Sequence, residues 1–422
     1  ADIDLSDAGN RDPIGAESGT TAIFQGTFDG KGHSITGLTI DATVTSGAGN
    51  YGLFSTLGDQ AVVMDLNVLG AKVSATGSDG ADKIRAGVIA GSTTKAATSG
   101  HANIGTRIDS CSATGTVSAT SANDKLTYAG GIAGSGEIGT AITNCWTDVA
   151  VTAITKPVSN KNSMAGGIIG NSGNYVVIAN CATFGNVHAA SPSSTNFGGM
   201  AGGIVGMMAG KQYNAYATGN MTIGNGGSAH TWVGVLDGEV TSSGMSKDSN
   251  GAYTVYPEAG AFRLGNYYAT DATLKVEVYK NNGAERDTTT TLDPTVDRGY
   301  SSTMPTVDKA MVSTPMVKAD MAKEAFAETL NGNIKEINGI LAAYGITGIA
   351  LREWQVEDGK VLPTGSVWVT GEIDDSIFAS GNGSKDSPYL ITNDEQLRDF
   401  AASLNNKIDY TGKYVALEND IT

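Results

Sequence analysis

A recurring Ala-Gly motif constrains this chain more than any other feature of its sequence. It occurs at residues 85–91, 128–134, 164–170 and 200–206 as RAGVIAG, YAGGIAG, MAGGIIG and MAGGIVG. The glycine after each alanine follows the preceding one by 43, 36 and 36 residues. A fixed period of this length is typical of repeat proteins, in which each repeat buries its apolar face against its neighbours.

A second motif runs in step with the first and indicates the kind of repeat. It reads IDSC at 108–111, ITNC at 142–145 and IANC at 178–181, and continues as YNAY at 213–216. The segments are short, β-branched and bounded by glycine, without helical periodicity. They predict a parallel β-helix, in which equivalent residues stack about 4.8 Å apart. A β-propeller has a similar period but needs hairpin turns at a constant offset, which the sequence lacks.

Three cysteines share one phase of the repeat. Cys111, Cys145 and Cys181 are 34 and 36 residues apart, so we expect them to form a ladder with one thiol per coil. Parallel Cβ vectors give poor disulfide geometry, and no histidine or second cysteine lies at ligand spacing. The prediction is a set of buried free thiols. Gly130, Gly166 and Gly202 are expected to form the corresponding glycine ladder.

Composition excludes some partners. The 422 residues carry a net charge of −16 and include 57 glycines. A strongly acidic surface disfavours nucleic acid and anionic membranes, and no apolar run reaches the length of a membrane-spanning helix. No signal peptide opens the sequence, which begins within a motif and is therefore expected to be a mature piece of a longer protein.

The periodicity changes along the chain and predicts five regions. We expect a β-helix of about eight coils at 1–270, a strand and loop insertion at 271–308, a helical and hairpin cap at 309–363, a linker at 364–387, and a strand-helix element at 388–422. In the insertion, 274–279 is predicted as a strand and 288–291 as a loop. The cap should contain one helix over 320–330 ended by Gly332, a second over 334–341, and a hairpin at 354–363.

The quoted motifs resemble those of a known family. Gly-Gly-Ile-Val-Gly followed by Ile-x-Asn-Cys, the lead-in at 24–38 and the segment at 383–391 are similar to the GLUG-motif repeats of bacterial surface and secreted proteins. The resemblance implies a right-handed parallel β-helix, a location outside the cell or on its surface, and a region that is not an enzyme. It carries over no catalytic residue and no cofactor.

The order of the family's elements suggests an assembly. The element at 388–422 normally precedes the lead-in, and Asn419-Asp-Ile-Thr422 aligns with Ala1-Asp-Ile-Asp4. We therefore expect copies to assemble head to tail into a fibre or stalk, with 371–422 completing the β-helix of the next unit. The residues expected at this contact are Ala1, Ile3, Leu5, Tyr414, Val415, Leu417 and Ile421.

Three other readings are less well supported. A polysaccharide lyase or hydrolase would need clustered charged groups, whereas Asp109, Asp148 and Lys211 share no phase and His33, His101, His188 and His230 are scattered. Calcium could bind oxygen-rich loops at Asp2, Asp4, Asp374 and Asp375. An adhesin for host or matrix glycans could use Tyr213, Tyr216, Trp232, Tyr267 and Tyr268 as a platform, although such residues more often stack inside a solenoid.

Overall fold

The computed structural model contains two compact units, each described here by itself. The body is Ala1–Gly365 and the C-terminal unit is Ser366–Thr422. The structure describes residues 1–17, 20–21, 23–96, 104–122, 125–155, 162–192, 198–226, 232–240, 245–247, 253–255, 261–280, 285–295, 313–343, 346, 349–367, 373–405, 408, 410 and 412–421.

Three of the four large sheets in the body consist of short parallel strands. One contains β7 (Gly47–Tyr51), β11 (Ala81–Gly87), β15 (Leu126–Gly130), β19 (Ser163–Gly166), β24 (Gly199–Gly202) and β29 (Trp232–Gly234). The second contains β8 (Phe54–Leu57), β12 (Ala90–Thr93), β16 (Ala133–Gly136), β20 (Ile169–Ser172), β25 (Val205–Met208) and β30 (Asp237–Val240). The third contains β4 (Thr27–Asp29), β9 (Val62–Met64), β13 (Thr106–Asp109), β17 (Thr140–Thr143), β21 (Val177–Ala179), β26 (Lys211–Tyr213) and β33 (Phe262–Leu264).

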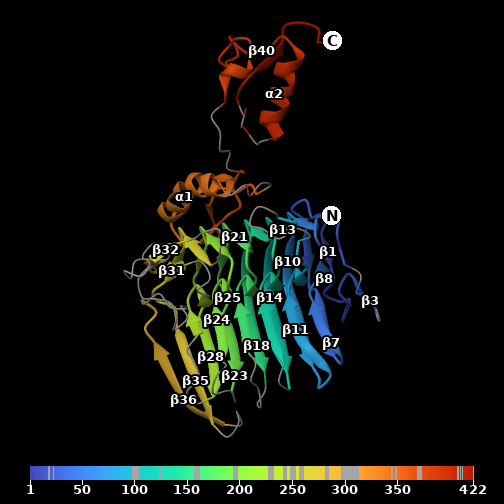
Figure 1. Ribbon diagram of the computed structural model, residues 1–422, viewed down its shortest axis with the longest axis vertical. Coiled ribbons are helices and arrows are strands. Elements are labelled where there is room, and N and C mark those ends of the chain that lie inside the picture. Colours follow the sequence, from blue (N-terminus) through green and yellow to red (C-terminus); the bar gives the residue numbers. More distant parts are fainter. Residues whose placement is uncertain are drawn as a thin grey trace. The chain divides into compact units, whose positions relative to one another are not determined.

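The fourth sheet is the largest and carries the outer face discussed below. Its strands are β1 (Ile3–Asp4), β5 (Ser34–Thr36), β6 (Thr39–Val44), β10 (Asn67–Gly77), β14 (Ser112–Ser121), β18 (Trp146–Thr155), β22 (Ala182–Thr183), β23 (Val187–Ser191), β27 (Tyr216–Ala217), β28 (Met221–Gly226), β34 (Tyr267–Ala269), β35 (Leu274–Lys280), β36 (Glu285–Leu292) and β37 (Thr314–Met316). Figure 1 shows its long strands side by side, following the sequence colours. Apart from the antiparallel pair β35–β36, its neighbouring strands are parallel.

The chain visits the four sheets in a recurring order. β11, β12, β13 and β14 fall in four different sheets, and β15 to β18 repeat the sequence of visits one layer further along. The predicted stack of parallel sheets is therefore confirmed, and the propeller alternative, which requires antiparallel blades, is wrong. Ile108, Ile142 and Ile178 are register partners and are buried, as expected for apolar side chains that fill each layer.

The repeated glycines occupy places where two backbones nearly touch. Gly130, Gly166 and Gly202 are register partners in adjacent strands. A Cβ built on Gly166 would lie 2.1 Å from the carbonyl oxygen of Ile169. The motif thus retains glycine because the neighbouring strand leaves no space for a side chain.

The cap differs from its predicted boundaries. A single helix, α1 (Glu324–Ala343), replaces the two expected helices and continues through Gly332, because a residue without a side chain weakens a helix but does not end it when the flanking turns pack well. Thr314-Pro315 in the sequence predicts the start of a helix, but Thr314–Met316 forms β37, and residues 288–291 lie in β36 instead of a loop. The predicted hairpin is present as β38 (Gln355–Glu357) and β39 (Lys360–Leu362).

The C-terminal unit has a small core of its own. It contains a 3₁₀ turn η2 (Asp375–Ile377), the parallel pair β40 (Tyr389–Ile391) and β41 (Val415–Leu417), and α2 (Asp394–Asn405). Phe378, Tyr389 and Ile391 are buried against one another. Two further antiparallel pairs, β2 (Ala16–Glu17) with β3 (Thr20–Thr21) and β31 (Met245–Lys247) with β32 (Tyr253–Val255), belong to the body. In the described part of the chain, no helix is both long and apolar enough to span a membrane.

Candidate functional site

At one corner of the stack, a column of residues, one from each layer, has a backbone conformation in the left-handed region. Its members and φ values are Asp65 (49°), Ser110 (52°), Asn144 (52°), Asn180 (56°), Asn214 (51°) and Gly265 (67°). Asparagine, aspartate and glycine tolerate this region better than other residues. The left-handed backbone conformation therefore largely decides which residue type precedes each cysteine of the repeat.

The asparagine side chains of this column also bind a crossing segment. Asn144 and Asn180 donate through Nδ2 to the carbonyl oxygens of Ala350 (2.7 Å) and Arg352 (2.6 Å). Asn214 donates to the carbonyl of Leu330 in α1 at 3.0 Å. Successive asparagines are joined to one another, with Nδ2 of Asn180 donating to Oδ1 of Asn144 at 3.1 Å. We call residues 349–365 the strap, since this corner holds them across several layers.

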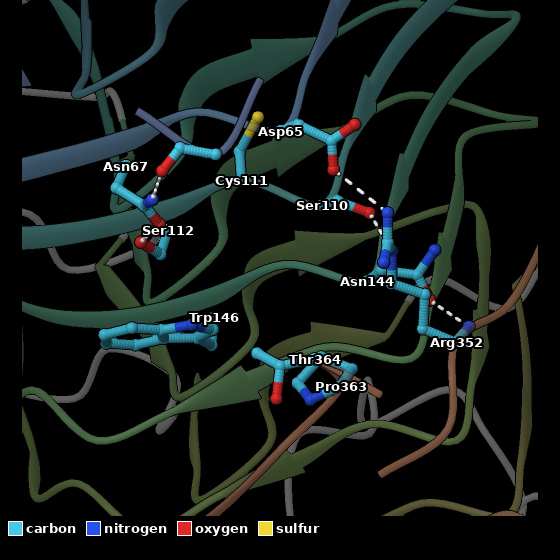
Figure 2. A pocket seen from close by; sticks show the side chains of 11 residues that line it. Asp65, Asn67, Ser110, Cys111, Ser112, Asn144, Trp146, Arg352, Pro363 and Thr364 are labelled. Atoms are coloured by element: carbon cyan, nitrogen blue, oxygen red, sulfur yellow. Dashed lines mark hydrogen bonds and ion pairs between the residues drawn. The ribbon is translucent and has the colours of Figure 1, made fainter. Parts of the chain in front are cut away.

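Arg352 ties the strap to the first layers of the corner. Its Nη2 lies 3.0 Å from Oδ1 of Asp65, and its Nε donates to Oγ of Ser110 at 2.8 Å. Its backbone N–H donates to Oδ1 of Asn144 at 2.8 Å. These contacts border a pocket of about 160 Å³ that Trp146 and Thr364 also line. Figure 2 shows Arg352 on one side of this corner pocket and Trp146 on another.

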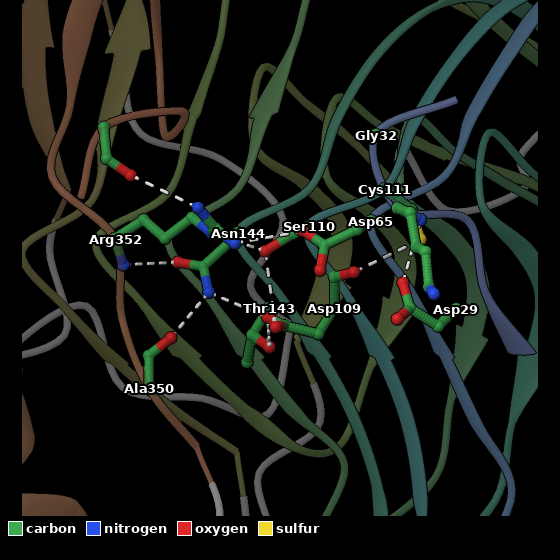
Figure 3. Close-up of polar contacts among 12 residues, drawn as sticks. Asp29, Gly32, Asp65, Asp109, Ser110, Cys111, Thr143, Asn144, Ala350 and Arg352 are labelled. Atoms are coloured by element: carbon green, nitrogen blue, oxygen red, sulfur yellow. Dashed lines mark hydrogen bonds and ion pairs between the residues drawn. The ribbon is translucent and has the colours of Figure 1, made fainter. Parts of the chain in front are cut away.

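A hydrogen-bond relay continues from Arg352 toward the interior. Ser110 Oγ donates to Oδ2 of Asp109 at 3.3 Å, and Asp109 Oδ1 accepts from Thr143 Oγ1 (2.6 Å) and Asn144 Nδ2 (2.7 Å), as Figure 3 shows. Burial raises the pKa of Asp109, while the hydrogen bonds from Thr143 and Asn144 and the charge of Arg352 oppose this shift.

The chemistry available in the corner pocket is limited by this mutual pairing. Burial raises the pKa of the Cys111 thiol well above its ordinary value, so the sulfur stays protonated and weakly nucleophilic. Ser110 already accepts from Arg352 and donates to Asp109. The polar side chains that line the pocket are therefore suited to holding the strap in place. Cys111, Cys145 and Cys181 are all free and buried.

The edge of the body at β1 is a second candidate surface. β1 pairs with β5 on one side, and Ile3 is 51% exposed. A pocket of about 220 Å³ lies beside it, lined by Ala1, Ile3 and Phe28 together with Ile35 and Leu66. The lining is mainly apolar, which makes this edge suitable for covering by another strand.

The C-terminal unit exposes apolar side chains of its own. Leu417 in β41 is 62% exposed and Tyr414 is 49% exposed. Val415 and Ile421, by contrast, pack against the core of this unit. Among the residues predicted for an inter-unit contact, Ala1, Ile3, Tyr414 and Leu417 are thus exposed, and Leu5 is half-buried.

The calcium candidates are engaged in local backbone contacts. Asp2 accepts from the backbone N–H of Ser34, Asp4 from that of Ser6, and Asp374 from that of Ser376. Asp375 accepts from the Tyr389 hydroxyl at 2.6 Å. The described residues contain no group of three or more histidine, cysteine, aspartate or glutamate side chains that could hold a metal ion.

The aromatic platform expected for an adhesin is not exposed. Tyr213, Tyr216 and Tyr268 are buried, and Tyr216 and Tyr267 pack edge-on against Phe326 of α1. Tyr216 and Tyr267 therefore contribute to the contact between the stack and the cap, whereas Tyr213 packs against Phe262 within the stack and Trp232 is half-buried. His101 and His230 lie outside the described residues, while Lys211 is buried and Asp148 forms an ion pair with Lys360 at 2.9 Å.

In the C-terminal unit, Thr392 and Glu395 predict a capping box at the start of α2, and the structure forms the cap one residue later. Asn393 Oδ1 accepts from the backbone N–H of Gln396, and Gln396 Oε1 accepts from the backbone N–H of Thr392. The expected box of Thr392 and Glu395 is therefore wrong in register. Asn and Gln form the same reciprocal arrangement as the expected pair, so residue type alone did not distinguish the two registers.

Several residues of the corner pocket were not predicted. Arg352 carries no periodic signal because it lies outside the repeats, and Trp146 shares the register position of Ser112, Ala182 and Tyr216, which have no residue type in common. A signal did exist for Asp65, since it occupies the phase of Ser110, Asn144, Asn180 and Asn214 ahead of a buried residue. Extending the asparagine column backward would have identified it.

Comparison with known proteins gives little more than a distant likeness. No protein-family model and no curated protein matches the chain. A crystal structure from Bacteroides ovatus, described as a "putative immunoglobulin A1 protease", is similar with a TM-score of 0.47 and 19% identity, over 86% of this chain and 83% of that one. The name of that neighbour contradicts the prediction that this chain is not an enzyme. So distant a likeness, however, assigns no reaction to the chain.

Proposed function

We propose that this protein is a structural unit of an extracellular fibre or surface stalk, built on a right-handed parallel β-helix of about eight coils related to the GLUG-motif repeats. Copies would join head to tail, with the C-terminal unit of one copy covering the β1 edge of the next. The observation that carries this proposal is the presence of two exposed apolar strand surfaces in one chain.

The two surfaces are chemically alike. Ile3 in β1 is 51% exposed beside an apolar pocket, and Leu417 in β41 is 62% exposed. Covering apolar surface contributes about 25 cal/mol per Å², and an open strand edge also offers unpaired backbone groups. β41 belongs to a parallel pair, like the strands that it would extend. A contact of this kind between different surfaces of successive copies would propagate into a filament.

Cysteine cross-linking tests the contact, because the three native thiols are buried. Ile3→Cys and Leu417→Cys are purified separately, mixed and oxidised. We expect a disulfide-linked dimer of the two variants. Val317→Cys provides the matched control, since Val317 is 44% exposed in the body and outside the proposed contact.

The double variant Ile3→Cys/Leu417→Cys distinguishes assembly from docking within one chain. Assembly predicts a ladder of linked species whose length increases with protein concentration. Formation of a circular monomer alone, or cross-linking of the mixed variants no faster than with Val317→Cys, would overturn the proposal. Electron microscopy of the unmodified protein at high concentration then shows whether the linked species correspond to filaments.

A further inference from the structure

A groove on the outer face of the largest sheet is the most conspicuous hollow that the corner contacts do not explain. It crosses β18, β23, β28 and β35 and encloses about 450 Å³. Residues lining it include Thr152, His188, Thr222, Lys275 and Glu277. The groove therefore runs across the strands, parallel to the direction in which the layers stack.

Four of these side chains form one column. Thr152 is the register partner of His188, His188 of Thr222, and Thr222 of Lys275. Neighbouring strands lie about 4.8 Å apart, so the column extends for about 14 Å. The groove thus presents one polar side chain from each of four consecutive strands, at regular intervals.

A second column of amides lies alongside. Asn186 Oδ1 accepts from the backbone N–H of Asn220 at 3.1 Å, and Asn220 Oδ1 accepts from that of Thr273 at 2.8 Å. Both asparagines line the groove. Their oxygens are thus occupied by the backbone, whereas their Nδ2 groups donate to no described residue and are available to a ligand.

The first column contains groups that also lack partners. Nε2 of His188 is buried and makes no hydrogen bond with any described residue. A buried polar atom without a partner costs about 1–3 kcal/mol, and a ligand hydroxyl would remove this cost once rotation of the imidazole ring turns Nε2 into the groove. Lys275 forms no ion pair within the described part of the chain, and its side chain is exposed. The groove therefore offers an imidazole nitrogen, an ammonium group and two threonine hydroxyls.

One wall of the groove is held rigidly. Glu277 Oε2 accepts from the Tyr279 hydroxyl and Oε1 from Arg286 Nη1, both at 2.8 Å. These contacts fix the carboxylate two residues beyond Lys275 along β35. Ala150 also lines the groove, and its short side chain leaves space for a ligand.

We propose that this groove binds a linear saccharide chain lying across the strands. Hydroxyl groups both donate and accept, so they match His188 in either tautomer as well as the free amide and ammonium donors. A peptide would use a sheet edge for backbone pairing, whereas this groove lies on a face whose backbone groups are already paired. Nucleic acid is disfavoured by the net charge of −16 and by Glu277. The proposal does not depend on head-to-tail assembly.

An array of linear oligosaccharides tests the groove, using glucan, mannan, xylan, chitin and polygalacturonate fragments. The full chain is applied, and the affinity of each retained fragment is measured by titration calorimetry. His188→Ala removes the unpaired nitrogen, and Thr222→Arg fills the middle of the column. Ser74→Arg is the matched control, because Ser74 belongs to the same column two strands beyond Thr152 and outside the groove.

We expect His188→Ala to weaken binding about tenfold, the effect of losing one good hydrogen bond, and Thr222→Arg to abolish it. Ser74→Arg should bind within about twofold of the unmodified chain. Circular dichroism confirms that each variant is folded. The proposal is overturned if the unmodified chain retains no oligosaccharide, or if it binds one with an affinity that neither His188→Ala nor Thr222→Arg changes.

Discussion

The corner pocket and the outer groove are both polar hollows on the same stack, but they differ in what their side chains already bind. In the corner, Arg352 donates to Asn144 and Ser110, and Asn144 in turn donates to Asp109. In the groove, His188 Nε2 has no partner among the described residues. The corner therefore holds the protein together, whereas the groove retains capacity for a ligand.

This difference separates two uses of the same ladder geometry. Stacked layers place equivalent side chains about 4.8 Å apart whether they face a strap or solvent. A ladder that faces another segment becomes paired and contributes to stability. A ladder that faces solvent keeps exposed groups such as the Lys275 ammonium free at little cost to the fold, whereas the buried Nε2 of His188 does carry a cost.

The largest expected effect is in the corner, at Asn180. Its Nδ2 donates to Arg352 O at 2.6 Å, and its Oδ1 accepts from Trp354 Nε1 at 2.9 Å and from Asn214 Nδ2 at 2.7 Å. Asn180→Ala leaves these buried groups without partners and also places alanine at φ 56°. We expect the free energy of unfolding to fall by about 4 kcal/mol, measured by denaturant titration.

Two variants sharpen this result. Asn180→Gly removes the same amide but tolerates the backbone conformation, so its loss should be smaller than that of alanine by about 1 kcal/mol. Thr222→Ala in the groove should change stability by less than about 0.5 kcal/mol. Equal losses at Asn180 and Thr222 would contradict the distinction between a paired and a free ladder.

The cations Arg352 and Lys275 form a matched pair, and their effect on stability should be intermediate in size. Arg352→Met removes the guanidinium that contacts Asp65 and Ser110, leaving partly buried acceptors unpaired. We expect a loss of about 2 kcal/mol and a lower melting temperature. Lys275→Met removes a cation that has no ion-pair partner among the described residues, so the melting temperature should change little.

A reversed order of these two effects would mean that Lys275 is structural and that the groove is part of the scaffold. Binding measurements provide the complementary result. Lys275→Met should weaken retention on the oligosaccharide array, whereas Arg352→Met should leave the affinity of the folded protein unchanged. Calorimetry on both variants checks this crossed pattern.

The stack itself could be predicted because its signal is local and repeated. Ile108, Ile142 and Ile178 recur with the cysteines, and the structure places the isoleucines in one register. The glycine motif was also informative, since Gly130, Gly166 and Gly202 are required where backbones approach closely. Periodicity identifies such positions because every layer faces the same steric constraint.

The corner pocket and the groove could not be predicted in the same way. Arg352 reaches Asp65 across 287 positions of sequence, and no repeat relates the two. Lys275 and His188 come from layers of different length, so their spacing along the chain does not reveal that they share a column. Gly332 predicts an end to the helix, but α1 continues through it because Phe326 and Leu330 are buried in the turns on its N-terminal side.

The smallest expected effects concern pH, and they have opposite signs in the two hollows. The pKa of Asp109 is raised above 3.8 by burial, so stability from this group is present below pH 3.8 and is lost as the pH rises through its folded pKa. The pKa of His188 is lowered below 6.5, mainly by burial and against the influence of Glu277. Stability from His188 is therefore present above pH 6.5 and is lost as the pH falls through the folded pKa.

Two variants should therefore differ in how their free energy of unfolding depends on pH. Asp109→Asn should flatten the decline on raising the pH from 3.8, and His188→Gln should flatten the decline on lowering it from 6.5. A bound oligosaccharide that covers His188 should enlarge the second effect, because excluding water from the imidazole further disfavours its charged form. If saccharide leaves the His188 profile unchanged while binding elsewhere in the chain is detected, the imidazole does not touch the ligand.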